Sequence, residues 1–381
     1  MAPMSTAAAA LLVLFGVVSL ATTWNAAKPV LNPTRRYSPL WLPAMVVTEL
    51  APFWLTVQLA MLLIGAVLGG PSSTAGRIGG WIVVVSVAMT VWLMIRSAIG
   101  VRRLTALVEG AVQPGRGVGR WFGRPTQTPV GIVEQARVAW RGDLTLDVIR
   151  PIHQLEHTPV VIYVHGGGWT GGDPQRQARD LYHALSLDGW VVLSVRYPFT
   201  PSVSVETQIE TIRQAVAWAR QTWAPSRVVL AGGSAGGHLA AMVALTSDEP
   251  VDACVGIYGV YDMANRNRTR APWTKIRNEV MQASVDEAME RYRTVSPLDQ
   301  IDGVTPPFLV VHGTHDTLVP IGEATQFVDA LRAAQRPVDF LQVFGAQHAF
   351  DALSSPTSRT AAAAIRTWLR RVVVDAPSAR T

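Results

Sequence analysis

The 381-residue sequence has few charged side chains and a single cysteine. Asp, Glu, Lys and Arg make up 16% of the chain, and the mean hydropathy is +0.22, a balance typical of chains with long apolar segments. The lone cysteine, Cys254, excludes an internal disulfide, and its place in an apolar run predicts a buried small hydrophobe. The net charge of +6 comes without basic residues interleaved with aromatics, so no nucleic-acid partner is expected.

The charge deficit is concentrated in the first hundred residues, which contain apolar segments at 6–24, 52–70 and 78–95. Each has about 18 or 19 residues, and at 1.5 Å per residue it nearly crosses a hydrocarbon core of about 30 Å. We therefore predict three transmembrane helices within residues 1–100. The alternative is a signal peptide followed by a buried helical hairpin, but no basic side chain precedes the first segment.

The basic side chains near the three segments predict their orientation. The first loop carries Lys28, Arg35 and Arg36, whereas the second loop has only Arg77. The arginines after the third segment are Arg96, Arg102, Arg103, Arg116, Arg120 and Arg124. With three spans, the first loop and the C-terminal part share a side, so we predict a multi-pass protein of the cell membrane with its C-terminal domain in the cytoplasm. A cleaved first segment would place that domain outside. The arginine cluster also suits contact with anionic membrane lipids.

Beyond residue 100 the chain divides into three further regions. We predict a juxtamembrane linker at residues 101–129, a catalytic domain at residues 130–374 and a loose tail at residues 375–381. In the central region short apolar runs alternate with helix-forming runs, which predicts a mostly parallel sheet with helices on both faces. The polar interval 262–306 breaks this alternation. It is either a cap over the active site or a surface excursion without function.

A serine between small residues follows one of these apolar runs. The turn reads Gly232-Gly233-Ser234-Ala235-Gly236, the G-x-S-x-G spacing, and a helix-forming run comes directly after it. Such a strand–turn–helix forces the serine into a strained conformation that exposes its hydroxyl. Glycines two residues before and after let strand and helix pass closely. Ser234 is therefore the predicted nucleophile.

A glycine run after another predicted strand supplies hydrogen-bond donors. The run consists of His165, Gly166, Gly167, Gly168 and Trp169. The backbone N–H groups of Gly167 and Gly168, together with that of Ala235, are free to point at a developing negative charge and form the predicted oxyanion hole. His165 is expected to brace the turn by hydrogen bonding rather than to act as a base.

The predicted acid is Asp316, on the loop after a further apolar strand. Its carboxylate can hold an imidazole in the required tautomer. Asp299 and Asp302 are weaker alternatives because they precede the strand. His312, His315 and Asp316 share one tight loop, and such a group rarely converges on an ion without further ligands, so we expect no metal.

The predicted base is His348, which lies on a glycine-containing loop after the last strand. The chain order Ser234, Asp316, His348 is the one found in α/β-hydrolases. His238 stands one helical turn from the serine and is interpreted as a helix-packing residue. His153, His157 and His183 are expected at the surface.

From Leu144 to about His348 the chain resembles an α/β-hydrolase carboxylesterase of the hormone-sensitive-lipase type. The segments that carry the resemblance are 144–151, 165–169, 232–237, 312–320 and 345–350. The resemblance implies the α/β-hydrolase fold, no cofactor, and esters of short to medium acyl chains. Gly233 stands where many members carry an acidic residue, and Trp169 replaces a frequent phenylalanine; both features are similar to formamidases and isoprenylcysteine methylesterases. The apolar segments resemble those of membrane-tethered actinobacterial esterases.

These observations predict a membrane-anchored serine carboxylesterase or lipase-like hydrolase that acts on a small-molecule or lipid ester. An amidase, a formamidase or an isoprenylcysteine methylesterase-type hydrolase on the same fold is the first alternative. A non-catalytic membrane-bound binding module is the second.

Overall fold

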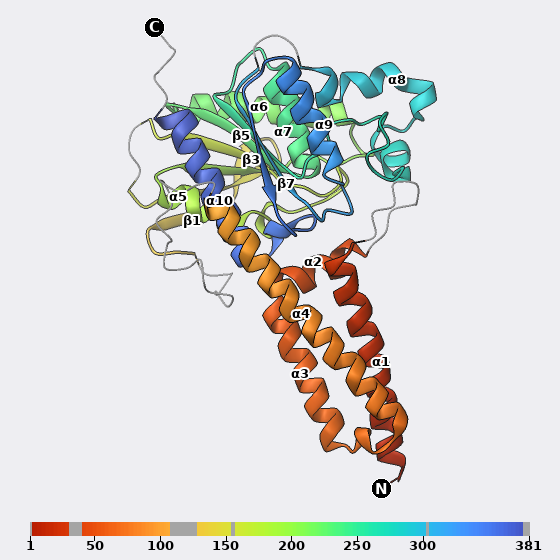
Figure 1. Cartoon of the computed structure of the whole chain (residues 1–381). Helices are drawn as coiled ribbons and strands as arrows, with labels where there is room; N and C mark the ends of the chain where they lie inside the picture. Colours follow the sequence, from red (N-terminus) through yellow and green to blue (C-terminus); the bar gives the residue numbers. More distant parts are fainter. Residues whose placement is uncertain (1, 30–39, 107–127, 154–156, 302–304, 376–381) are drawn as a thin grey trace.

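The chain folds into a bundle of apolar helices and an α/β domain that lies at one end of the bundle (Figure 1). The computed structural model describes residues 2–29, 40–106, 128–153, 157–301 and 305–375. The predicted linker beyond residue 106, the tail beyond residue 375, Asp302, and five arginines of the orientation argument (Arg35, Arg36, Arg116, Arg120, Arg124) lie outside these residues.

The bundle contains helices α1 (Ala2–Ala27), α3 (Ala51–Val67) and α4 (Thr74–Ala106), joined between α3 and α4 by the short helix η1 (Gly70–Ser72). A fourth helix, α2 (Trp41–Glu49), was not expected; it makes an angle of 91° with α3 and lies next to the α/β domain (Figure 1). Among the described residues, α1 and α4 are each long and apolar enough to cross a membrane, and α2 with α3 counts as a third if the bent pair is one span. The three predicted spans fall on α1, α3 and α4, and their place in a membrane stays a prediction.

A buried polar cluster joins the three long helices. The Gln58 amide of α3 donates to Ser19 Oγ of α1 at 2.9 Å and to Ser86 Oγ of α4 at 2.8 Å. Trp54 Nε1 donates to Thr23 Oγ1 at 3.2 Å. Since a buried polar side chain without a hydrogen-bond partner is costly, such hydrogen bonds help to specify which helices pair and in which register.

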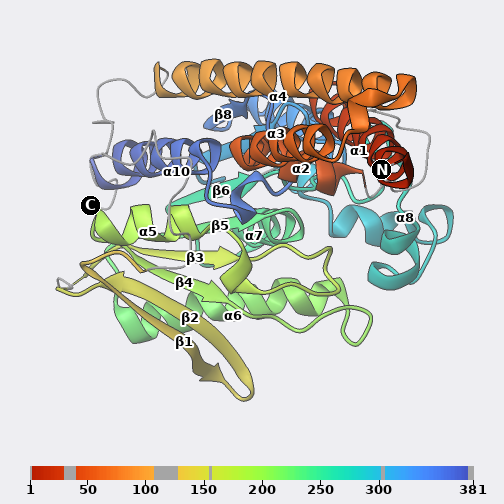
Figure 2. The ribbon, with the colours of Figure 1, turned by 90° about the horizontal axis from the view of Figure 1, so that it is seen from below.

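Helix α4 continues to Ala106, six residues past the boundary predicted for the membrane region. At this end it lies beside β8 and α10 of the α/β domain (Figure 2). A Cβ atom on Gly100 would lie 3.1 Å from the carbonyl oxygen of Phe344, so the helix backbone approaches the loop after β8 closely. The segment predicted as the start of a linker is therefore a packed part of the molecule.

The α/β domain is built on an eight-stranded sheet with the order β1-β2-β4-β3-β5-β6-β7-β8. The first pairs, β1–β2 and β2–β4, are antiparallel and the remaining pairs are parallel. The strands are β1 (Ile132–Arg141), β2 (Leu144–Pro151), β3 (Val160–Val164), β4 (Val191–Val195), β5 (Val228–Gly233), β6 (Ala253–Ile257), β7 (Phe308–Gly313) and β8 (Val338–Val343). The central strands are buried on both faces, as their continuous apolar runs predict.

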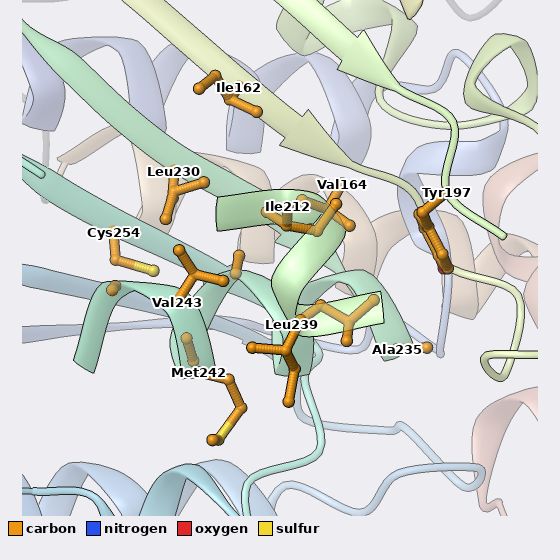
Figure 3. Packing of buried hydrophobic residues seen from close by; sticks show 14 of the residues in the cluster. Ile162, Val164, Tyr197, Ile212, Leu230, Ala235, Leu239, Met242, Val243 and Cys254 are labelled. Carbon is orange, nitrogen blue, oxygen red and sulfur yellow. The ribbon is translucent and has the colours of Figure 1, made fainter. Parts of the chain in front are cut away.

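Helices cover both faces of the sheet. The α-helices are α5 (Arg179–Leu187), α6 (Val205–Trp223), α7 (Ala235–Thr246), α8 (Val285–Thr294), α9 (Gly322–Ala333) and α10 (Pro356–Leu369). The shorter helices are η2 (Pro174–Arg176), η3 (Ile276–Val280), η4 (Pro297–Asp299), η5 (Phe350–Ala352) and η6 (Arg370–Val374). Helices α6, α7 and α9 pack on one face, and α5 and α10 on the other. Figure 3 shows the first of these cores, where Val243 of α7 lies near Leu230 and the buried Cys254.

Candidate active site

Ser234 occupies the sharp turn between β5 and α7. Its backbone angles, φ 55° and ψ −120°, lie in a region that side-chain-bearing residues rarely adopt. A Cβ atom on Gly232 would lie 2.3 Å from the Gly236 carbonyl oxygen, and one on Gly236 would lie 1.9 Å from the Val164 carbonyl oxygen. The two glycines are therefore required for strand, turn and helix to pass each other, and the partly exposed serine hydroxyl points out of the turn.

His348 and Asp316 reach this hydroxyl from the loops after β8 and β7. His348 Nε2 lies 3.0 Å from Ser234 Oγ, and His348 Nδ1 lies 2.7 Å from Asp316 Oδ2. Because Nδ1 faces a carboxylate, it carries the proton and donates, which leaves Nε2 as an acceptor for the serine hydroxyl. The carboxyl ends of parallel strands meet at one edge of the sheet, so residues 234, 316 and 348 come together there.

The Asp316 carboxylate is buried and held on both oxygens. Its Oδ1 accepts hydrogen bonds from the backbone N–H groups of Leu318 and Val319, at 2.9 and 2.8 Å. Burial by itself raises the pKa of this carboxyl, but the neighbouring His348 and His312 side chains outweigh it and lower the pKa to about 2. Asp316 is thus an anion at neutral pH. The weaker sequence alternative, Asp299, instead forms an ion pair with Arg266 at 2.6 Å.

The glycine turn after β3 lies directly against the serine. A Cβ atom on Gly166 would lie 3.1 Å from Ser234 Cβ. The Gly166 N–H donates to Gln177 Oε1 at 2.8 Å, so this group is already used within the fold. The turn is therefore anchored at its first glycine.

The backbone N–H groups of Gly167, Gly168 and Ala235 have no acceptor among the described residues. Gly167 has a φ of +143°, and a Cβ atom there would lie 1.9 Å from the Gly171 carbonyl oxygen. Both the angle and the close approach exclude any other residue. Backbone N–H groups without acceptors suit a developing oxyanion, so these three groups remain the predicted donors of the oxyanion hole.

His165 and His238 both have structural hydrogen bonds. His165 Nδ1 donates to the Gly166 carbonyl at 2.8 Å, and its ring stacks on Tyr197 with 4.6 Å between ring centroids. The Trp169 indole donates to His238 Nδ1 at 3.1 Å, and His238 Nε2 donates to the Val295 carbonyl at 2.7 Å. Burial lowers the pKa of His238 to about 4, so it stays neutral and can accept from the indole. A phenylalanine in place of Trp169 would leave this acceptor without a donor.

The other histidines lie away from the serine or point elsewhere. His153 and His157 are exposed, as expected, but His183 is partly buried because its ring pairs with Glu134 at 2.7 Å. His315 lies 3.5 Å from an Arg96 guanidinium nitrogen instead of joining His312 and Asp316. Over the described ranges, no group of three or more His, Cys, Asp or Glu side chains is arranged to hold a metal ion.

Gly233, the departure from the family pattern, has a specific neighbour. A Cβ atom there would lie 2.9 Å from the Tyr258 hydroxyl and 3.0 Å from the Tyr163 hydroxyl. The Tyr258 hydroxyl donates to Asp351, whose pKa burial raises to about 6. Two tyrosines thus fill the space of the missing side chain. The sequence had no signal for Tyr163, Tyr258 or Asp351 at this position, because all three are far from Ser234 along the chain.

The polar interval 262–306 contributes a cation near the glycine turn. A Cβ atom on Gly168 would lie 3.2 Å from Lys275 Nζ, just before helix η3. This lysine has no hydrogen bond or ion pair with any residue in the described part of the chain. The interval therefore reaches the glycine turn at Gly168.

Comparison with known proteins identifies the family. A family model described as BD-FAE matches residues 146–331. Esterase LipC of Mycobacterium tuberculosis is 36% identical over 235 residues, which cover 56% of this chain and 58% of LipC. The probable carboxylic ester hydrolase LipM of the same organism is 30% identical over 399 residues, which cover 93% of this chain and 91% of LipM. The chain belongs to the α/β-hydrolase carboxylesterases of the hormone-sensitive-lipase type.

This membership confirms the predicted enzyme class, a carboxylic-ester hydrolase. The match to LipC spans little more than half of that protein, whereas the match to LipM takes in most of the N-terminal helices of this esterase as well. Among solved structures, a thermostable esterase from Pseudomonas putida ECU1011 superimposes with a TM-score of 0.53 at 25% identity, covering 64% of this chain and 84% of that one. The predicted α/β-hydrolase fold is confirmed.

Proposed function

We propose that this esterase is a membrane-anchored serine hydrolase that cleaves carboxylic esters through an acyl-enzyme formed on Ser234. One observation carries the proposal. Hydrogen bonds run without interruption from the Asp316 carboxylate through His348 to Ser234 Oγ, with distances of 2.7 and 3.0 Å. A serine hydroxyl becomes a useful nucleophile only when a base and a group that orients the base are placed in this way.

The reaction proceeds in two matched halves. Ser234 Oγ attacks the ester carbonyl while His348 Nε2 takes the hydroxyl proton. The imidazolium that results is stabilised by ionised Asp316 and then protonates the leaving alcohol, which leaves the acyl group on the serine. Water, deprotonated by His348, repeats the attack and releases the carboxylic acid. The N–H groups of Gly167, Gly168 and Ala235 stabilise the tetrahedral oxyanion in both halves.

The proposed location follows from the apolar helices and the basic side chains. In this proposal α1, α3 and α4 cross the membrane, and residues 130–374 form a cytoplasmic catalytic domain with residues 262–306 as its cap. The position of α2 supports this arrangement, because it brings the chain after the first span to the same end of the bundle as the α/β domain. Protease added outside sealed cells or right-side-out vesicles should leave the domain intact; cleavage without detergent would contradict the cytoplasmic location.

A fluorophosphonate probe tests the nucleophile directly, because such probes react with activated serines. Membranes that contain the wild-type protein should be labelled, and Ser234→Ala should not. Ser202→Ala, which removes an exposed hydroxyl, is the matched control and should be labelled like the wild type. Equal labelling of the wild type and Ser234→Ala would contradict the proposal.

A further inference from the structure

Helix α2 brings a side chain from the N-terminal region to the candidate base. The Trp41 ring at its first turn lies edge-on to the His348 imidazole, with 5.7 Å between ring centroids and 85° between ring planes. This edge-to-face arrangement is a favourable aromatic contact. Trp41 as a whole is only partly buried.

The far end of α2 is fixed to the catalytic domain by a buried carboxylate. Glu49 is 2% exposed, and the Ser355 hydroxyl donates to its Oε2 at 2.5 Å. Ser355 caps the N-terminus of α10, and burial raises the pKa of the Glu49 carboxyl to about 7. This pairing fixes the end of α2 to the segment between β8 and α10, which also carries His348.

The opposite face of α2 is apolar and exposed. Leu42 is 49% and Val46 is 38% exposed, and the two lie one turn apart on the same side of the helix. Leu40, just before the helix, is 54% exposed. The helix lies across the end of the apolar bundle that faces the catalytic domain (Figure 1). Exposed leucines and valines at this level match a helix that lies in the interface between lipid and water.

We infer that α2 is an interfacial helix, and that Trp41 at its end binds the hydrocarbon part of a long-chain ester that reaches Ser234 from the membrane. This inference rests on the proposed function and adds a substrate class to it. The exposed face of α2 contacts lipid, and the indole, in contact with His348, gives an acyl or alkyl chain an apolar surface next to the base. Trp41 is then a specificity-determining residue that the N-terminal region supplies to the active site.

The test compares a short and a long ester on the full-length protein in phosphatidylcholine vesicles. We measure kcat/KM for p-nitrophenyl acetate and p-nitrophenyl laurate. Trp41→Ala should lower the laurate-to-acetate ratio about tenfold, the effect of losing contact with one or two methylene groups. Trp41→Phe should restore most of the ratio. Trp81→Ala, which removes a 71%-exposed indole on α4, is the control and should leave the ratio unchanged.

The other outcomes distinguish a role of Trp41 in binding the hydrocarbon chain from a role in positioning His348. An equal loss on both esters would mean that Trp41 only holds His348 in place, and would overturn the inference, as would an unchanged ratio. The double variant Leu42→Ser/Val46→Ser alters exposed positions only and should also lower the ratio in vesicles. Fluorophosphonate labelling of each variant verifies a folded site. Hydrolysis of acetate by Ser234→Ala would instead refute the proposed function.

Discussion

Replacing Asp316 by asparagine is the sharpest test of the site, because the structure determines how the new amide must point. The Leu318 and Val319 N–H groups both donate to Oδ1, so an amide oxygen would stay at that position. The amide NH₂ would then face His348 Nδ1 in place of an acceptor. To avoid two donors in contact, the imidazole would adopt the tautomer with its proton on Nε2. In that form it cannot accept the Ser234 proton.

The expected effect on turnover is large, since a wrong imidazole tautomer in such a site lowers kcat by about 10⁴-fold. The same change affects stability. The pKa of Asp316 is lowered from 3.8 to about 2, and a shift of this size corresponds to about 2 kcal/mol. Because the pKa in the folded state is depressed, this stabilisation is present above about pH 4 and is lost as the pH falls towards 2. Asp316→Asn should lack it at neutral pH.

The assay is kcat for p-nitrophenyl acetate at pH 7, with chemical unfolding at the same pH. Asp299→Asn is the matched control: it makes the same chemical change at an aspartate paired with Arg266, and kcat should stay within twofold of the wild type. A kcat for Asp316→Asn within tenfold of the wild type would refute the role of Asp316. So would a larger loss in the control.

Three further predictions follow from neighbouring residues. Gly167→Ala should lower kcat at least 10²-fold, because its Cβ would meet a carbonyl oxygen at 1.9 Å and displace a donor; Gly171→Ala, with open space around it, is the control in the same assay. Burial raises the pKa of Asp351 from 3.8 to about 6, so the folded state loses stability as the pH rises from about 4 to 6. Between pH 4 and pH 8, the free energy of unfolding of Asp351→Asn should therefore fall by about 3 kcal/mol less than that of the wild type. Lys275→Met should lower kcat about threefold to tenfold through the weaker positive field near the oxyanion, whereas Arg277→Met, at an exposed site, should not.

Much of the catalytic domain can be read from local sequence, because its signals are short-range. Continuous apolar runs predicted the buried strands, and glycine-rich turns after them predicted where the chain stops and reverses. Ser234, Asp316 and His348 were selected because each follows such a run, and parallel strands bring those positions to one edge of the sheet. The confirmed fold and enzyme class rest on this local logic. The prediction that His183 lies at the surface was wrong, because its partner Glu134 is 49 residues away along the chain.

The sequence by itself determined the α/β-hydrolase class, the residues proposed for the site and the apolar character of the N-terminal helices, since each depends on short local patterns. The tertiary structure decided what surrounds that chemistry. Trp41 is 307 positions from His348, and Glu49 is 306 from Ser355. Such contacts exist only because α2 turns across the bundle and docks on the loops of the sheet, and no local pattern encodes that docking. The G-x-S-x-G turn at Ser234 is thus a property of the sequence, whereas the contact of α2 with His348 is a property of the fold.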